Sequence, residues 1–101
     1  MAVDVLFHRL AIQEYRAACR WYGRRSPRTE QAFRNAIDRA VQQIAADPEQ
    51  WPTYRNHYRW VRTRRFPYVL YYHVLDEDHA VILAVAHARR RPGYWLRRSR
   101  S

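Results

Sequence analysis

The sequence predicts an α+β fold in which an antiparallel helical hairpin packs on one face of a mainly antiparallel sheet. Two stretches repeat apolar residues at the four-three-four spacing of a helix stripe, and a short strand-like stretch precedes them. Three aromatic and β-branched stretches of strand length follow. Helices grouped before consecutive strands are typical of an α+β arrangement rather than of alternating parallel units.

The first expected elements are a strand and a helix. Residues 3–7 alternate apolar and polar side chains, apart from Leu6, which predicts a strand with one face in the core. From Leu10 the period changes, and we expect a helix that runs to about Gly23, because glycine commonly ends helices. Its predicted core stripe is Ala11, Tyr15, Ala18 and Tyr22.

A second helix is expected to begin immediately afterwards. Ser26 can accept hydrogen bonds from the free amides of a first turn, and Pro27 suits the first helical position. Asp47-Pro48 ends the helix, because proline disfavours a helical residue before it. The predicted core stripe is Phe33, Ile37, Ala40 and Ile44.

The rest of the chain is expected to form the sheet. Residues 49–57 form a polar connection, and residues 58–65, 68–75 and 80–87 are the three expected strands, with a turn at 76–78 between the last two. The predicted order is therefore β-α-α-β-β-β. In the tail from Pro92, we expect Tyr94 and Trp95 to anchor a short turn or helix.

Length and composition favour one packed domain. The chain has 101 residues, of which 48% are hydrophobic and 15% aromatic, enough bulk for a single core and too much for a disordered basic tail. We therefore expect residues 1–101 to form one domain.

The charge is large and lies mostly in the second half. All 19 basic residues are arginines, against nine acids, and the formal net charge is +10. Residues 1–52 hold eight arginines and six acids, whereas residues 53–101 hold eleven arginines and three acids. The absence of lysine is explained equally well by a surface specialised for bidentate arginine contacts and by a biased genomic base composition. The concentration of positive charge in the second half indicates an acidic or anionic partner for that half.

Several classes of function are disfavoured. The lone Cys19 forms no internal disulfide and fits a reducing compartment. No pair of histidines has the i, i+4 spacing of a helical metal site, and two glycines do not make a phosphate loop, so we expect neither a metal nor a cofactor. No apolar run approaches the ~20 residues of a membrane span, and we expect a soluble, unexported protein of the cytoplasm.

Short motifs in a particular order carry a family resemblance. They are Trp21-Tyr22, Asp47-Pro48, Phe66-Pro67-Tyr68, Tyr71-Tyr72, Ala86-His87 and the run from Arg89 to Trp95. With these motifs the chain resembles the RelE/ParE toxin superfamily, often described as plasmid stabilisation proteins, over nearly its whole length. The resemblance implies a RelE/ParE-like fold and a toxin of a bacterial type II toxin–antitoxin system, neutralised by a cognate, acidic antitoxin encoded alongside.

The resemblance implies one of two activities. ParE-like members inhibit DNA gyrase by binding, whereas RelE-like members cleave messenger RNA in the ribosome. For cleavage of messenger RNA, the family pattern places catalytic roles on Arg62, Arg64, Arg89 and Tyr94. Proton transfer would fall to His87 or Tyr94. An arginine expected in the third strand is replaced by Val69. The basic residues Arg62 and Arg64 cannot act as a general base, because the pKa of arginine is too high for its side chain to lose a proton. We therefore prefer inhibition of gyrase by binding.

Other interpretations of these residues stay open. His87 can equally hydrogen-bond within the fold, and Tyr94 can pack the terminal turn against the sheet. Residues 58, 60, 62 and 64 would share one sheet face, where arginines and aromatic rings suit RNA, or where arginines protect an edge strand from aggregation. A third hypothesis is a non-toxic basic module that binds nucleic acid.

The residues expected to contact a target or an antitoxin are Arg65, Arg90, Arg91, Trp95, Arg97 and Arg98.

Overall fold

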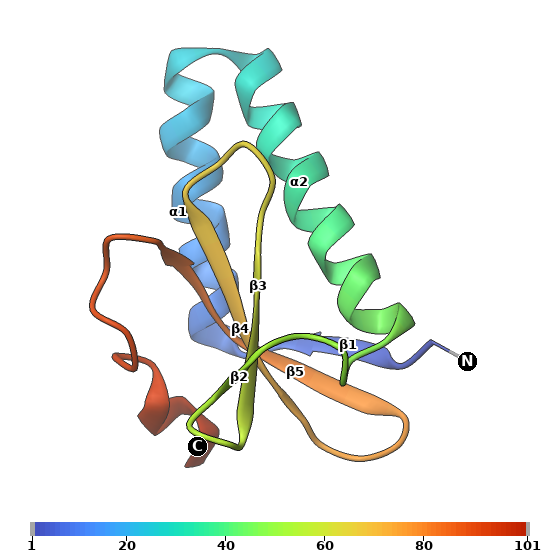
Figure 1. Cartoon of the computed structure of the whole chain (residues 1–101). Helices are drawn as coiled ribbons and strands as arrows, with labels where there is room; N and C mark the ends of the chain where they lie inside the picture. The colour runs from blue at the N-terminus through green and yellow to red at the C-terminus, as the bar shows by residue number, and fades with distance from the viewer. Residues whose placement is uncertain (1, 101) are drawn as a thin grey trace.

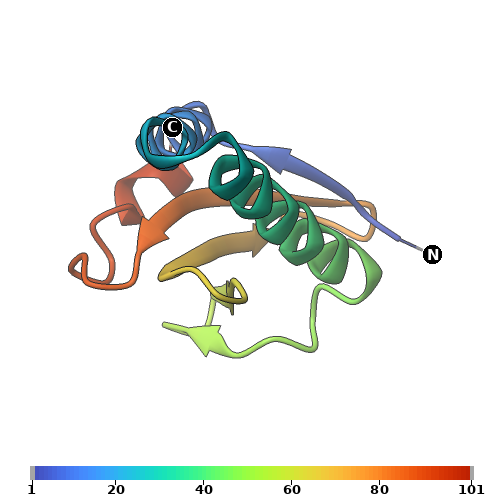
Figure 2. The same ribbon diagram turned by 90° about the horizontal axis from the view of Figure 1, so that it is seen from above.

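The computed structural model describes residues 2–100, which form a helical hairpin on a five-stranded sheet of order β1-β5-β4-β3-β2. Figure 1 shows the hairpin rising from the sheet, and Figure 2 shows both helices along one side of it. We call the side covered by the helices the first face and the opposite side the second face. The predicted α+β class is confirmed.

The two helices share a single capping residue. Helix α1 spans Arg9–Arg25 and α2 spans Pro27–Ala46. The Ser26 amide donates to the carbonyl of Tyr22 at the end of α1, and its Oγ accepts from the amides of Arg28 and Thr29 at 3.1 and 3.3 Å. The predicted start of the second helix is therefore confirmed, and one serine closes both helix ends.

The expected end of the first helix was wrong by two residues. Gly23 lies inside α1, which continues to Arg25. A Cβ atom on Gly23 would clash with Oε1 of Glu30 on α2. The glycine therefore gives the carboxylate of the neighbouring helix room beside α1 and does not terminate it.

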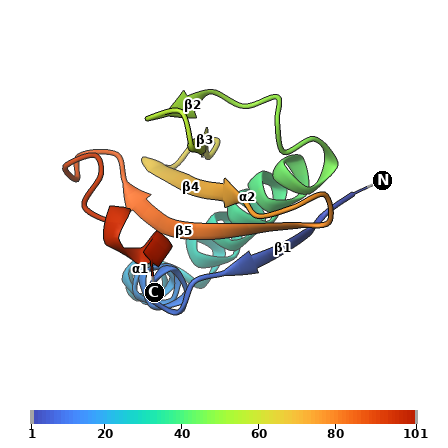
Figure 3. The ribbon, with the colours of Figure 1, turned by 90° about the horizontal axis from the view of Figure 1, so that it is seen from below.

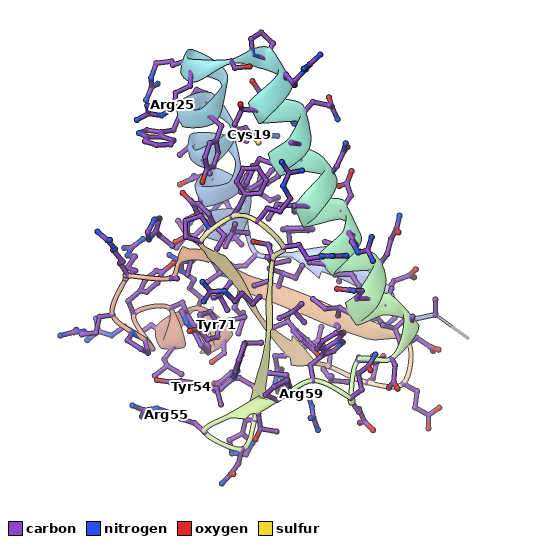
Figure 4. All side chains as sticks on the ribbon, turned by 45° about the horizontal axis from the view of Figure 1, so that its top comes forward. Cys19, Arg25, Tyr54, Arg55, Arg59 and Tyr71 are labelled. Atoms are coloured by element: carbon purple, nitrogen blue, oxygen red, sulfur yellow. The ribbon has the colours of Figure 1, made fainter. Side chains whose placement is uncertain are left out.

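The first face carries the larger core. Both predicted helix stripes pack on it, and Phe33, which is fully buried, lies 4.9 Å from the ring of Tyr22 and 5.2 Å from that of Tyr68. Cys19 is 2% exposed and lies between the helices (Figure 4). These residues join the hairpin to the sheet in one continuous apolar cluster.

The sheet is mixed but mainly antiparallel. Strand β1 (Asp4–Phe7) pairs in parallel with β5 (His79–His87), and β4 (Tyr68–Val74) pairs with β5 in the antiparallel sense. Strand β3 (Tyr58–Arg62) continues the antiparallel order, and β2 (Thr53–Tyr54) follows at the far edge. The three predicted final strands are thus present, and β2 is an additional one.

Two details of the predicted strands were wrong. The connection at residues 49–57 contains β2 and a turn in which Arg55 and Asn56 have φ of 53° and 67°. Strand β3 ends at Arg62 and not at residue 65, because Thr63 Oγ1 donates to a turn carbonyl at 3.0 Å and Arg65 takes a left-handed φ of 72°. The expected sheet face of residues 58 to 64 therefore stops at Arg62.

A bulge in β5 changes which residues of that apolar strand point to each face of the sheet. Tyr71 pairs with Ala84 and Tyr72 pairs with Ile82, so Leu83 is an extra residue. Ile82 belongs to the first-face core, whereas Leu83 and Ala84 both belong to the cluster on the second face. From Val85 onward the alternation is restored with the opposite phase.

The second face is covered by the end of the chain. Residues 88–100, which we call the C-terminal segment, leave β5 and finish in the short helix η1 (Leu96–Arg100), beside α1 in Figure 3. Trp95 is fully buried, and its ring centroid lies 4.7 Å from that of Tyr71 and 5.0 Å from that of Tyr58. Within residues 2–100, neither helix combines the length and apolarity needed to cross a membrane.

Candidate functional site

The arginine-rich C-terminal segment is attached to α1 through one carboxylate. Both terminal nitrogens of Arg98 donate to Glu14, to Oε1 at 2.9 Å and to Oε2 at 3.0 Å. Tyr94 donates its hydroxyl to Oε2 at 2.6 Å, and Arg90 donates to the same atom at 3.3 Å. Glu14 and Arg98 are only 15% and 12% exposed in their side chains, so water screens this ion pair weakly. We call these four residues the Glu14 anchor.

The anchor also completes the edge of the sheet. Strand β1 pairs with β5 only as far as Ile82, so the next backbone groups on that edge have no strand opposite them. Glu14 Oε1 accepts the amide of Val85 at 3.0 Å, and Arg98 donates to the carbonyl of Leu83 at 2.9 Å. Two side chains thus satisfy the hydrogen bonds that a longer β1 would make.

Tyr94 is held between cations. The guanidinium carbon of Arg90 lies 3.6 Å from the centroid of its ring, and that of Arg98 lies 5.1 Å away. Burial, followed by the hydrogen bond to Glu14, raises the pKa of Tyr94 above its ordinary value of 10.0. The hydroxyl is therefore a neutral donor, already committed to Glu14.

The residues proposed for RNA cleavage lie on different sides of the sheet. Arg62 is paired with Val69, and directly opposed residues point to the same face. Since Tyr68 and Leu70 pack on the first face, Val69 and Arg62 point to the second. His87 lies on the first face, where its ring is 5.3 Å from that of Tyr68.

The remaining nuclease candidates are separated as well. His87 Nδ1 accepts the backbone amide of Arg89 at 3.1 Å, which occupies one imidazole nitrogen in a local turn. Arg89 itself is exposed. Arg64 lies in the β3–β4 turn, next to Arg65 and beside α2. The structure does not gather the five candidates around one point.

The residues expected to contact a target or antitoxin fall into two groups. Arg65, Arg91 and Arg97 are exposed and make no ion pair with any residue between 2 and 100. Arg90 and Arg98 are engaged by Glu14, and Trp95 is buried in the second-face cluster.

A groove of about 540 Å³ opens between α1 and the ends of β4 and β5. Its floor is mostly apolar, and Trp21, 44% exposed, forms one wall. The guanidinium carbon of Arg25 lies 3.8 Å from the Trp21 ring centroid, and Arg90 of the C-terminal segment also lines the groove. In Figure 4, Arg25 lies at the far end of the molecule from Tyr54 and Arg55. The residues lining the groove are Glu14, Ala17, Ala18, Trp21, Tyr22, Pro67, Tyr68, Val85, His87 and Arg90.

The role of Glu14 is not predictable from the sequence alone. Its contacts lie 71 to 84 residues away along the chain, beyond the reach of any local pattern. One signal was present: Glu14 is the only acid between Asp4 and Glu30, in a stretch rich in arginine. Among the described residues, no group of three histidine, cysteine, aspartate or glutamate side chains is placed to hold a metal ion.

The fold and surface define a small, basic α+β protein with an apolar groove beside α1 and an arginine-rich C-terminal segment paired to Glu14. A family model described as the ParE toxin of the type II toxin–antitoxin system, parDE, matches residues 5–92. The chain belongs to this family and is thus a toxin of the type II class, which implies a cognate antitoxin as its partner. A search of curated proteins finds no match.

Proposed function

We propose that this toxin arrests growth in the cytoplasm by binding DNA gyrase through its C-terminal arginines, without chemistry of its own. The family supplies the toxin class, and the location of the polar side chains supports inhibition by binding. The observation that carries the proposal is the separation of Arg62 from His87 by the sheet itself. Cleavage beside a 2′-hydroxyl needs proton transfer and charge stabilisation at one phosphate.

The Glu14 anchor supports the same conclusion. A general acid or base must be free to exchange its proton with the substrate, whereas the Tyr94 hydroxyl is held by Glu14 at 2.6 Å. Val69, 8% exposed, fills the position at which the nuclease pattern has an arginine. The exposed arginines are suited to binding acidic protein surfaces or phosphates.

For the antitoxin, we propose the groove beside α1 as a docking surface. Its apolar floor suits the apolar side of an amphipathic segment. The positive charges of Arg90, which lines the groove, and of Arg25, which stacks on the Trp21 ring, suit acidic residues. An antitoxin bound there would cover Trp21, one of the few large apolar side chains exposed in residues 2–100. This assignment agrees with an acidic antitoxin.

The test is inhibition of gyrase by purified toxin. A variant with Arg89, Arg91 and Arg97 changed to Gln should inhibit supercoiling roughly tenfold more weakly than the wild type, because exposed charges around a binding surface speed association with a partner of opposite charge. A matched variant changes Arg16, Arg20 and Arg28 to Gln, three exposed arginines on the helices. It carries the same net charge and should inhibit like the wild type.

Three results would overturn the proposal. Normal supercoiling at saturating wild-type toxin would remove gyrase as the target. Cuts inside the codons of translated message after induction, abolished by Arg62→Gln, would favour the ribosome-dependent nuclease. Harmless expression in the absence of any antitoxin would favour the basic nucleic-acid-binding module instead.

A further inference from the structure

We propose that Glu14 is a positioning residue, which holds the C-terminal segment in the conformation that binds the target. This inference rests on the proposed function, in which that segment carries the binding arginines. Glu14 contacts no target itself. It acts through Arg90, Tyr94 and Arg98, which it draws toward α1.

The segment needs such a residue because of its own charge. Residues 89–98 contain five arginines and no acid, so like charges repel one another within ten residues. Glu14 is the only acidic side chain within residues 2–100 that forms an ion pair with these arginines. A single carboxylate from α1 therefore offsets the repulsion.

Apart from the anchor, two long-range hydrogen bonds attach the ends of the segment to the sheet, one from the Ala88 amide to the Pro67 carbonyl at 2.7 Å and one between the Tyr58 and Ser99 hydroxyls at 2.9 Å. The other attachments are local or apolar. The amides of Arg90, Leu96 and Arg98 donate to carbonyls three residues earlier in the chain. Trp95 is buried by packing, and its Nε1 has no hydrogen-bond partner among the described residues. Apolar packing restrains a ring less specifically than hydrogen bonds of fixed direction. The forked contact of Arg98 with Glu14 supplies that direction.

The anchor also divides the arginines by orientation. Arg90 and Arg98 point to Glu14, whereas Arg89, Arg91 and Arg97 are exposed. An ordered segment presents the three exposed guanidinium groups in one arrangement, and binding then needs no further ordering of the chain. Loss of the carboxylate would leave five mutually repelling arginines on a mobile segment.

The test compares Glu14→Gln with Glu30→Gln. Glutamine keeps the shape of the side chain and removes the charge. Glu30 is a matched control, because it also accepts a two-nitrogen contact from an arginine, Arg34, but within α2 and away from the segment. Hydrogen exchange of residues 88–98, cleavage by trypsin within them, and inhibition of gyrase are measured for both variants and the wild type.

We expect Glu14→Gln to speed exchange and cleavage in residues 88–98 by about tenfold or more, while the amides of α2 stay protected. Inhibition of gyrase should weaken by about tenfold. Glu30→Gln should leave both readouts at the wild-type level. Arg98→Gln should reproduce the effect of Glu14→Gln, and the double variant should be no worse than either single one.

Two outcomes overturn the inference. Unchanged exchange of residues 88–98 in both Glu14→Gln and Arg98→Gln would show that the packing of Trp95 and the remaining hydrogen bonds hold the segment without the anchor. A loosened segment with undiminished inhibition would show that its order is irrelevant to binding. The exchange readout does not use gyrase, so a wild-type toxin that fails to inhibit gyrase overturns the proposed function separately.

Discussion

The first face of the sheet lies under two helices of 17 and 20 residues, whereas the second lies under a short irregular segment. On the first face, an apolar cluster runs from α1 through Phe33 to β5. On the second, a smaller cluster gathers around Trp95, and a polar anchor at Glu14 holds the segment that covers it.

The difference in contacts indicates that the two faces contribute differently to stability and to local opening. A large apolar interface between long elements forms a cooperative unit, because each contact supports many others. A short segment held mainly by one buried ring, one carboxylate and a few hydrogen bonds to the sheet has fewer contacts and opens at lower cost. We therefore expect the first face to contribute most of the stability of the fold and the second face to determine the shape of the basic surface.

The largest expected effect tests the first face. Phe33→Ala removes a fully buried ring in contact with both Tyr22 and Tyr68. We expect the free energy of unfolding to fall by about 4–5 kcal/mol, measured by urea denaturation. Every protected amide should lose protection together. Arg39→Ala, an exposed site on the same helix, is the control and should change stability by less than about 0.5 kcal/mol.

Trp95→Ala tests the second face and should cost less, about 3 kcal/mol, because the segment can open without the hairpin. Hydrogen exchange should show lost protection in residues 88–100 and retained protection in α2. Uniform loss across the molecule would contradict the comparison, since both faces would then form one cooperative unit. The control is Trp21→Ala, an exposed tryptophan, with an expected change below about 1 kcal/mol.

Alkaline pH should weaken both faces at once. Burial raises the pKa of Tyr72 on the first face to about 12, and raises that of Tyr94 in the anchor above 10.0. A raised tyrosine pKa means that folding favours the neutral phenol, so its contribution is complete below pH 10 and is lost as the pH rises through the folded value. For Tyr72 the expected loss between about pH 10 and 12 is roughly 2–3 kcal/mol.

The measurement is the free energy of unfolding at several alkaline pH values. Tyr72→Phe and Tyr94→Phe should each reduce the slope above pH 10, although Tyr94→Phe also removes the hydrogen bond to Glu14. A slope unaffected by either change would assign the alkaline sensitivity to other groups.

The smallest expected effect concerns the turn after β3. Arg65 has a φ of 72°, which glycine adopts without the crowding that a Cβ brings. Arg65→Gly should therefore raise stability by up to about 1 kcal/mol, seen as a higher Tm. Arg64→Gly, one residue earlier, has no positive φ to relieve and should not stabilise. If Arg65→Gly raised stability but weakened inhibition, the Arg65 side chain would have a role in binding the target.

The sequence was most informative where structure depends on near neighbours. The stripe of Phe33 and Ile37 and the Ser26-Pro27 start need only helical period and capping, so they were predicted correctly. The end of β3 was missed because Arg65 occupies a left-handed position at which glycine is the usual signal. Strand β2, only two residues long, is too short for a periodic pattern.

The candidate site was predicted less well for a different reason. Residues such as Arg62 and His87 were placed on strands correctly, but the face of each depends on pairing register. Glu14 joins segments more than seventy residues apart, and its role follows only from the folded arrangement. Residue type therefore predicted a basic surface in the second half of the chain. The folded geometry adds that Arg90 and Arg98 point to Glu14, whereas Arg89, Arg91 and Arg97 are exposed.

The bulge at Leu83 has a consequence for insertions and deletions. It reverses the alternation of β5, so everything that follows leaves the strand with the opposite side-chain phase. Deleting Leu83 would remove the bulge and leave His87 on its present face, whereas closing the bulge with Leu83 kept and paired to Tyr71 would turn His87 toward the second face and rotate the exit of the chain away from Glu14. The composition of the arginine-rich end would be untouched, yet its attachment would be lost. One unpaired residue thus sets which side of the protein receives its terminal charge.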